Sequence, residues 1–300
     1  MDKSAVRQLV KTVLHEDLLD LRLQPFGHHS VTYAVRLANR SVMVRMHRDP
    51  RTFEGTANNL EVLRRLGLPV PDLLYLDASL AAFPFAYTVL ERFEGRDLRY
   101  ELPAMTSAQI DVLARQIVSF QEAVATLPEG NGYGFVPIGS PAPHATWTAL
   151  VEADQHPWPE TRTPGLAERL HDLFEAYRPE LAALPATCFL DDVTTKNVIV
   201  HEGVLHGIVD LDVVCYGDAM YMLGLTATAI IADLDATQLR YADALRKAWR
   251  LTDAEYRRSC LYSALMGMDF LRKFGGADDA WATKMEHAIA QWMFSAERGP

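Results

Sequence analysis

Three side chains near the middle of the sequence have the types and spacing that phosphoryl transfer requires. Asp192 is followed five positions later by Asn197, and Asp210 ends the next apolar run. In enzymes that transfer phosphoryl groups, a loop aspartate takes the proton of the attacking hydroxyl, while an asparagine and a later strand-end aspartate hold the metal ions. This spacing indicates Asp192 as a candidate catalytic residue and Asn197 and Asp210 as candidate Mg²⁺ ligands.

The elements around these residues are predicted to form a β-hairpin. Residues 197–201 and 204–209 are rich in Val and Ile and are separated by an acid-glycine turn. The hairpin would put the first two side chains at the ends of one loop and the third at the end of the neighbouring strand. Oxygen ligands from such positions suit a hard cation bound beside phosphates. A lone loop aspartate is usually only a turn residue, so the interpretation depends on all three converging on one cleft.

Length and composition limit the classes of protein that fit. The chain has 300 residues, 49% of them hydrophobic, which suffices for one large domain or two lobes. The net charge of −10 argues against nucleic-acid binding and mildly favours cationic or neutral small substrates.

Cysteine content and apolar runs indicate the compartment. The 3 cysteines are unclustered, so they indicate neither a disulfide framework nor a zinc site. The first residues resemble an amphipathic helix rather than a signal peptide, and the longest uncharged run, residues 219–232, is too short to span a membrane. We therefore expect a cytoplasmic protein without a membrane partner.

The first part of the chain is predicted to be a five-stranded antiparallel sheet with helices. Residues 21–46 alternate and are β-branched, which indicates three strands, and residues 73–76 and 85–91 supply two more. Apolar residues recur at helical spacing over residues 5–19 and 53–66.

Two features of this sheet could contact phosphates. A glycine with polar neighbours between the first two strands lets backbone amides approach phosphate oxygens, which makes Gly27 and Ser30 candidates. Arg45, near the end of the third strand, is a candidate cation for the phosphates. Alone, the loop could be an ordinary hairpin turn and Arg45 a solvated strand residue.

Beyond Gly95 the chain is predicted to be mostly helical. Residues 127–158 are rich in loops, with a short helix near Leu150. Helices are expected near residues 106–125, 166–184, 219–232, 237–250, 252–274 and 278–296. The sequence thus predicts an α+β fold with an N-terminal nucleotide-binding lobe over residues 1–92 and a larger catalytic and substrate-binding lobe over residues 93–300.

Several motifs resemble those of the aminoglycoside phosphotransferase and choline kinase-like small-molecule kinases. They are L-E-R-F-E-G at the end of the fifth strand, D-V-T-T-K-N, and G-I-V-D-L-D followed by Y-G-D. The resemblance covers nearly the whole chain and implies a bilobal protein kinase-like fold. It also implies that residues 92–95, which leave the fifth strand, form the hinge between the two lobes. Adenine would pair there with the carbonyl of Glu91 and the amide of Phe93.

The chain departs from this family pattern in the catalytic loop. Leu190–Asp191 stands where His-Gly is usual, and T-T-K replaces the common H-P-G. Lys196 could contact the transferred phosphate or could be an exposed loop lysine. Asp212 resembles the second acid that often follows the metal aspartate.

A second departure concerns the partner of Arg45. The helix glutamate that normally pairs with the strand cation should fall near Asn59, which is not acidic. Either Glu54 or Glu61 reaches Arg45 from another turn, or the pair is absent.

These observations predict Mg²⁺-dependent transfer of the γ-phosphate of ATP or GTP to a hydroxyl of a small molecule, such as an aminoglycoside, an amino alcohol or a related metabolite. The chain would act as a monomer or homodimer. The alternative is a weak or inactive nucleotide-binding regulator of the same fold; a protein kinase is disfavoured because no A-P-E segment follows Asp210. Candidates for lining the acceptor pocket are Asp191, Asp212, Asp269, Trp147 and Tyr262.

Overall fold

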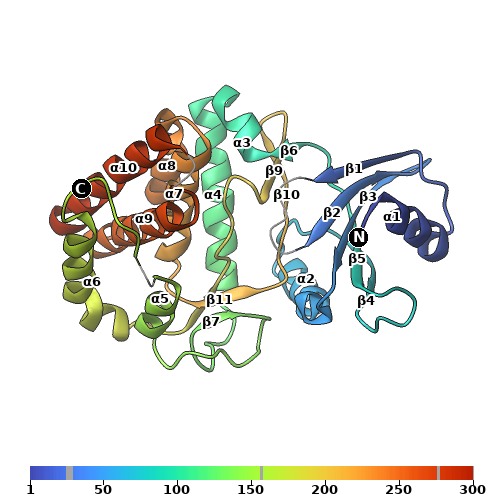
Figure 1. Cartoon of the computed structure of the whole chain (residues 1–300), viewed down its shortest axis with the longest axis horizontal. Coiled ribbons are helices and arrows are strands. Elements are labelled where there is room, and N and C mark those ends of the chain that lie inside the picture. Colours follow the sequence, from blue (N-terminus) through green and yellow to red (C-terminus); the bar gives the residue numbers. More distant parts are fainter. Residues whose placement is uncertain (25–29, 156–157, 276–277, 300) are drawn as a thin grey trace. The chain divides into compact units, whose positions relative to one another are not determined.

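The computed structural model describes residues 1–24, 30–155, 158–275 and 278–299, and the chain divides into two compact units (Figure 1). Unit 1 consists of Met1–Glu94 and His206–Val213, and unit 2 of Gly95–Leu205 and Val214–Pro300. Unit 1 therefore contains a short segment from far along the chain. The lobe boundary expected near residue 92 stays a prediction.

Unit 1 is built on a five-stranded sheet in the order β1-β2-β3-β5-β4, with every neighbouring pair antiparallel. The strands are β1 Asp20–Gln24, β2 Val31–Arg36, β3 Ser41–His47, β4 Leu73–Asp77 and β5 Ala86–Glu91. This arrangement confirms the predicted five-stranded antiparallel sheet. In β2, β3 and β5 several consecutive residues are buried, so both faces of the central strands are covered.

Helices cover the sheet of unit 1 and connect its strands. Helix α1, Lys3–Leu9, continues as a π-helical turn to Leu14, and the left-handed His15 ends it, earlier than the predicted residue 19. Its buried side chains join one apolar core with those of β2, β3 and β5. Helix α2, Thr56–Arg65, follows a 3₁₀ turn at Pro50–Phe53 and lies within the predicted helical range.

Unit 2 is mainly helical (Figure 1). Its α-helices are α3 Leu98–Glu101, α4 Ser107–Val124, α5 Trp147–Gln155, α6 Leu166–Ala182, α7 Met220–Asp233, α8 Arg240–Trp249, α9 Asp253–Phe274 and α10 Asp279–Arg298. Helix α9 packs against α7 and α10, and α4 packs against α8. Thr106 and Thr252 form capping boxes at the starts of α4 and α9, which explains where those helices begin. The larger, mostly helical second part and the α+β class are as predicted.

Short strands complete unit 2 and carry the chain back to unit 1. Strands β7 Gly134–Val136, β11 Val214–Gly217 and β8 Thr187–Phe189 form one sheet, and β6 Arg96–Asp97 pairs with β9 Val198–His201. Strand β10, Val204–Ile208, neighbours β9 in the sheet order and passes into unit 1 at His206. Within the described residues, every helix is too short or too polar to cross a membrane.

Candidate active site

Arg45 lies near the end of β3 and is almost fully buried, with 8% of its surface exposed. In the sheet register it stands opposite Thr32 of β2 and Thr88 of β5, so these three side chains share one face. Its guanidinium also lies over the ring of Phe53, 5.4 Å from the ring centroid. The alternative of a solvated strand arginine is therefore excluded.

Two carboxylates of unit 1 neutralise Arg45. Its Nη2 donates to Asp210 Oδ1 at 2.8 Å and to Asp212 Oδ2 at 2.6 Å, and its Nη1 donates to Asp212 Oδ1 at 3.1 Å. Burial of the guanidinium opposes its charge, but Asp212 and Asp210 outweigh this effect and raise the pKa of Arg45. The cation is thus fixed and permanently charged.

Asp210 follows β10 in a conformation that few non-glycine residues adopt. Its φ of 64° is left-handed, a region that aspartate tolerates better than most residues. Upstream, the Ile208 amide donates to the Pro69 carbonyl at 2.9 Å, which attaches the end of β10 to the segment after α2. The Asp210 side chain is 48% exposed, whereas that of Asp212 is 13% exposed. About half of the Asp210 side chain is therefore open to solvent, although it pairs with Arg45.

Helix α2 holds the segment that contains these carboxylates. Thr56 Oγ1 donates to Asp212 Oδ1 at 2.5 Å. Asn59 Nδ2 donates to the carbonyls of Leu211 at 3.0 Å and Asp212 at 2.9 Å. The partner of Arg45 is thus Asp212 together with Asp210. Glu61, considered from the sequence, instead pairs with Arg65.

Of the other candidate nucleotide-binding residues of unit 1, Gly27 lies outside the described residues, and Ser30, Glu91 and Phe93 lie within them. Ser30 Oγ is 3.1 Å from Thr32 Oγ1, at the start of β2. Glu91 ends β5, where its amide donates to the Asp72 carbonyl at 2.8 Å, and the ring of Phe93 packs on Gly207 so closely that a Cβ there would overlap it. Their nucleotide contacts remain predictions.

The predicted catalytic loop in unit 2 is held by hydrogen bonds among its own residues. Asp192 is exposed, and its Oδ1 accepts from Thr194 Oγ1 at 2.8 Å. Asn197 Nδ2 donates to the Asp192 carbonyl at 3.0 Å, and the Asn197 amide donates to the Thr194 carbonyl at 3.1 Å. Because the side-chain nitrogen Nδ2 of Asn197 donates within the loop, the side-chain oxygen Oδ1 is the atom of this residue suited to a metal ion. Convergence of this loop with Asp210 stays a prediction.

Neighbouring elements of unit 2 anchor the loop from outside. The buried Gln121 of α4 donates to the Leu190 carbonyl at 2.7 Å and accepts from the Leu190 amide at 2.9 Å. The Arg99 amide donates to the Thr195 carbonyl at 3.0 Å. Lys196 Nζ pairs with Asp233 at 2.8 Å. The lysine therefore has a carboxylate partner; a role toward the transferred phosphate is untested.

The Gly217–Asp218 pair lies in a buried polar cluster. Asp218 Oδ2 accepts from Tyr262 Oη and from Arg258 Nε, each at 2.9 Å. Trp147 Nε1 donates to Tyr262 Oη at 2.7 Å. Burial raises the pKa of Tyr262, and the negative charge of Asp218 raises it further. Trp147 and Tyr262, expected as acceptor-pocket residues, are both 0% exposed, so they belong to the core instead.

The acids considered for the acceptor differ in their surroundings. Asp269 pairs with Arg272 and with Lys273, the latter at 2.6 Å, and Asp212 is occupied by Arg45. Asp191 is partly exposed beside the loop. The described residues contain no group of three or more His, Cys, Asp or Glu side chains able to hold a metal ion.

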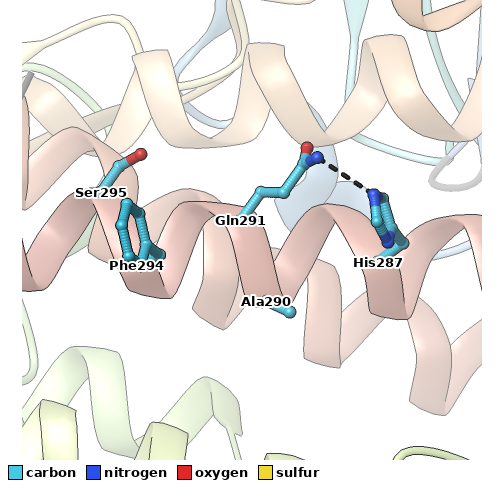
Figure 2. A pocket seen from close by; sticks show the side chains of 5 residues that line it. All are labelled: His287, Ala290, Gln291, Phe294 and Ser295. Carbon is cyan, nitrogen blue, oxygen red and sulfur yellow. Dashed lines mark hydrogen bonds between the residues drawn. The ribbon is translucent and has the colours of Figure 1, made fainter.

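A hollow in the surface of α10 contains none of the predicted site residues. Figure 2 shows it bordered by His287, Ala290, Gln291, Phe294 and Ser295. Gln291 and His287 are hydrogen-bonded to each other at 3.0 Å, and Phe294 is exposed. None of these lining residues is an aspartate, glutamate, lysine or arginine, so the hollow offers no carboxylate for a metal ion.

Thr56, Asn59 and Gln121 were not identified as site residues from the sequence. Each is a polar residue inside the apolar stripe of its helix: Thr56 and Asn59 share the buried face of α2 with Leu63, and Gln121 follows Ile117 by one turn on α4. A buried polar residue needs a hydrogen-bond partner. That interruption of the apolar pattern is the signal that could have identified them.

Comparisons with known proteins identify the family. A model of the phosphotransferase enzyme family matches residues 22–260, whereas a search of curated proteins gives no match. A thermostable mutant of aminoglycoside phosphotransferase APH(4)-Ia, in a ternary complex with AMP-PNP and hygromycin B, is 14% identical with a TM-score of 0.70, over 98% of this chain and 99% of that one. The microcompartment-associated aminopropanol kinase is 18% identical with a TM-score of 0.68, over 99% of this chain and 97% of that one.

The similarity to these solved structures shows a shared fold, and it confirms the protein kinase-like architecture expected from the motifs. The family model extends from β1 into α9 and so includes both units. It also confirms the resemblance on which the motif assignments rest. The chain therefore belongs to the phosphotransferase enzyme family.

Proposed function

We propose that the chain is a kinase that transfers the γ-phosphoryl group of ATP or GTP, with Mg²⁺, to a hydroxyl of a small molecule. Membership of a phosphotransferase family supports the reaction class. A neighbour of the same fold that contains AMP-PNP supports a nucleoside triphosphate donor. The neighbours that contain hygromycin B or act as an aminopropanol kinase support a small acceptor, and the net charge of −10 favours a cationic or neutral one.

The observation that carries this proposal is the pairing of Arg45 with Asp210. Buried ion pairs add little net stability on average, so a buried cation beside a half-exposed carboxylate favours a binding role. Arg45 would hold phosphate oxygens, because its charge persists at every physiological pH. Asp210 would hold Mg²⁺.

The donor atoms fit Mg²⁺ bound with phosphates. Mg²⁺ in such enzymes uses one or two carboxylates and takes its remaining ligands from phosphates and water. Asp210 and the amide oxygen of Asn197 are hard oxygen ligands, and the described residues offer no larger acidic cluster. When bound, the ion would neutralise charge on the phosphate oxygens.

The remaining predicted residues would position the two substrates. Asp192 would align the acceptor hydroxyl and take its proton, because its carboxylate is exposed and carries a hydrogen bond from Thr194. Main-chain groups of Glu91 and Phe93 would pair with the base, and Ser30 would approach the phosphates.

ADP release across a panel of aminoglycosides, amino alcohols and sugars tests this function. We expect turnover with at least one hydroxyl acceptor in Mg²⁺ and none in EDTA. Calorimetry with ATP should be run beside it. Tight ATP binding without turnover on any acceptor would instead support a nucleotide-binding regulator, and absence of ATP binding would refute both.

A further inference from the structure

Arg45 is held unequally by its two carboxylates. Asp212 engages it through two parallel hydrogen bonds, Nη1–Oδ1 at 3.1 Å and Nη2–Oδ2 at 2.6 Å, whereas Asp210 makes one bond at 2.8 Å. Such a fork-to-fork pair fixes both the plane and the position of a guanidinium. The Asp212 side chain is also the more buried, with 13% exposed against 48% for Asp210.

Asp212 is itself fixed by α2. Thr56 Oγ1 donates to the same Oδ1 atom that receives Arg45 Nη1, and Asn59 Nδ2 donates to the Asp212 carbonyl. Because Thr56 and Asn59 are three positions apart, they lie on one face of the helix. The helix thus holds Asp212 at its side chain and at its backbone, while Asp210 receives no such support from α2 in the described contacts.

Asn59 explains why the acid must come from elsewhere. It lies on the buried face of α2, and its side chain is neutral. A neutral amide cannot neutralise a buried guanidinium, and an unpaired buried charge is strongly unfavourable. Asp212 supplies the negative charge, and the amide of Asn59 holds it in place.

We infer that Asp212 is a positioning residue that orients Arg45 for phosphate oxygens, and that this leaves Asp210 available for the metal ion. The inference rests on the proposed function. Loss of the Asp210 bond leaves Arg45 with both Asp212 bonds, so the cation keeps its orientation when Asp210 turns to another partner. Asp212 would therefore orient Arg45 and Asp210 would bind the metal ion, although both residues follow strand β10.

The test is a double-mutant cycle on ADP affinity in EDTA, measured by calorimetry. Asp212→Asn should weaken metal-free ADP binding about tenfold, as Arg45→Gln should, because the freed guanidinium turns onto Asp210. The double variant should bind no more weakly than Arg45→Gln alone, since Asp212 acts through Arg45. Asp210→Asn should keep metal-free affinity and lose the gain in affinity that Mg²⁺ provides.

Thr56→Val is the second variant, in case Asp212→Asn does not fold. It keeps every charge and should shift metal-free ADP affinity in the same direction by a smaller factor. Asp17→Asn, an exposed acid of unit 1, is the matched control and should bind as the unaltered chain does.

Three results would overturn the inference. If the double variant lost metal-free ADP affinity by the product of the two single-variant factors, Asp212 would act independently of Arg45. An Asp212→Asn variant that keeps metal-free affinity but loses the Mg²⁺ gain would be a metal-ligand variant instead. If the unaltered chain binds no nucleotide with or without Mg²⁺, the proposed function is wrong, and this inference fails with it.

Discussion

Asp192 combines an exposed carboxylate with a tightly defined loop, so a conservative substitution there tests chemistry rather than folding. Asp192→Asn keeps an acceptor for Thr194 Oγ1 but removes the base. We expect turnover to fall roughly 10²- to 10⁴-fold, with ATP affinity within about twofold of the unaltered chain. Steady-state kinetics and calorimetry check this, with Asp172→Asn, an exposed acid of α6, as control. Normal turnover would refute the assignment.

Cys188, at the centre of β8, gives a pH-dependent prediction. Burial raises the pKa of its thiol to about 12, so the folded chain keeps the proton when the unfolded chain has lost it. Its contribution to stability is therefore complete below about pH 8.5 and declines as the pH rises towards 12. Between pH 8 and 10 we expect a loss of about 2 kcal/mol in unfolding free energy that Cys188→Ala lacks. Denaturant unfolding at several pH values checks this. The same loss of unfolding free energy between pH 8 and 10 in both proteins would contradict it.

Local motifs in the sequence suggest Asp192, Asn197, Asp210 and Arg45 as candidate site residues, and their roles stay predictions. It could not find the partner of Arg45. That pair joins residues 167 positions apart, and it depends on how the segment after β10 lies beside α2. Tertiary contacts of this kind leave no local period in the sequence.

At the scale of elements, α4 acts on the loop through one buried amide. Gln121 pairs with both backbone groups of Leu190, as a neighbouring strand would. Gln121→Leu leaves two buried polar groups unpaired, at a cost of roughly 2 to 5 kcal/mol. We also expect a lower kcat, because Leu190 lies two residues before Asp192. Urea denaturation and steady-state kinetics check both effects, with Gln116→Leu on the same helix as control. A change in unfolding free energy below about 0.5 kcal/mol would refute the proposed role of the Gln121–Leu190 hydrogen bonds.

Long elements were predictable and short ones were not. The helical period gave α4, α6 and α9 within a few residues, and β-branched alternation gave β1 to β3. Strands β6, β7, β8 and β11 were missed, since each contains between 2 and 4 residues and shows no period. Such strands form because a distant segment pairs with them.

For the whole molecule, a bound nucleotide should raise thermal stability. At about 100 times its Kd, Mg²⁺ with AMP-PNP should add about 2.7 kcal/mol. A rise in Tm of about 4 °C follows for a chain of 300 residues. EDTA should remove most of the rise, and Asp210→Asn should remove the same part. A Tm that does not respond to nucleotide would count against the proposed function; Asp172→Asn serves again as control.

Unit 1 is not a continuous stretch of chain, because His206–Val213 joins it from beyond the catalytic loop. Grafting residues 1–94 from one family member onto another would therefore bring in a foreign strand arginine to meet the recipient's own pair of acids. The donor's helix would likewise meet a loop that it did not evolve with. An exchange of unit 1 in this chain therefore needs two segments, Met1–Glu94 and His206–Val213.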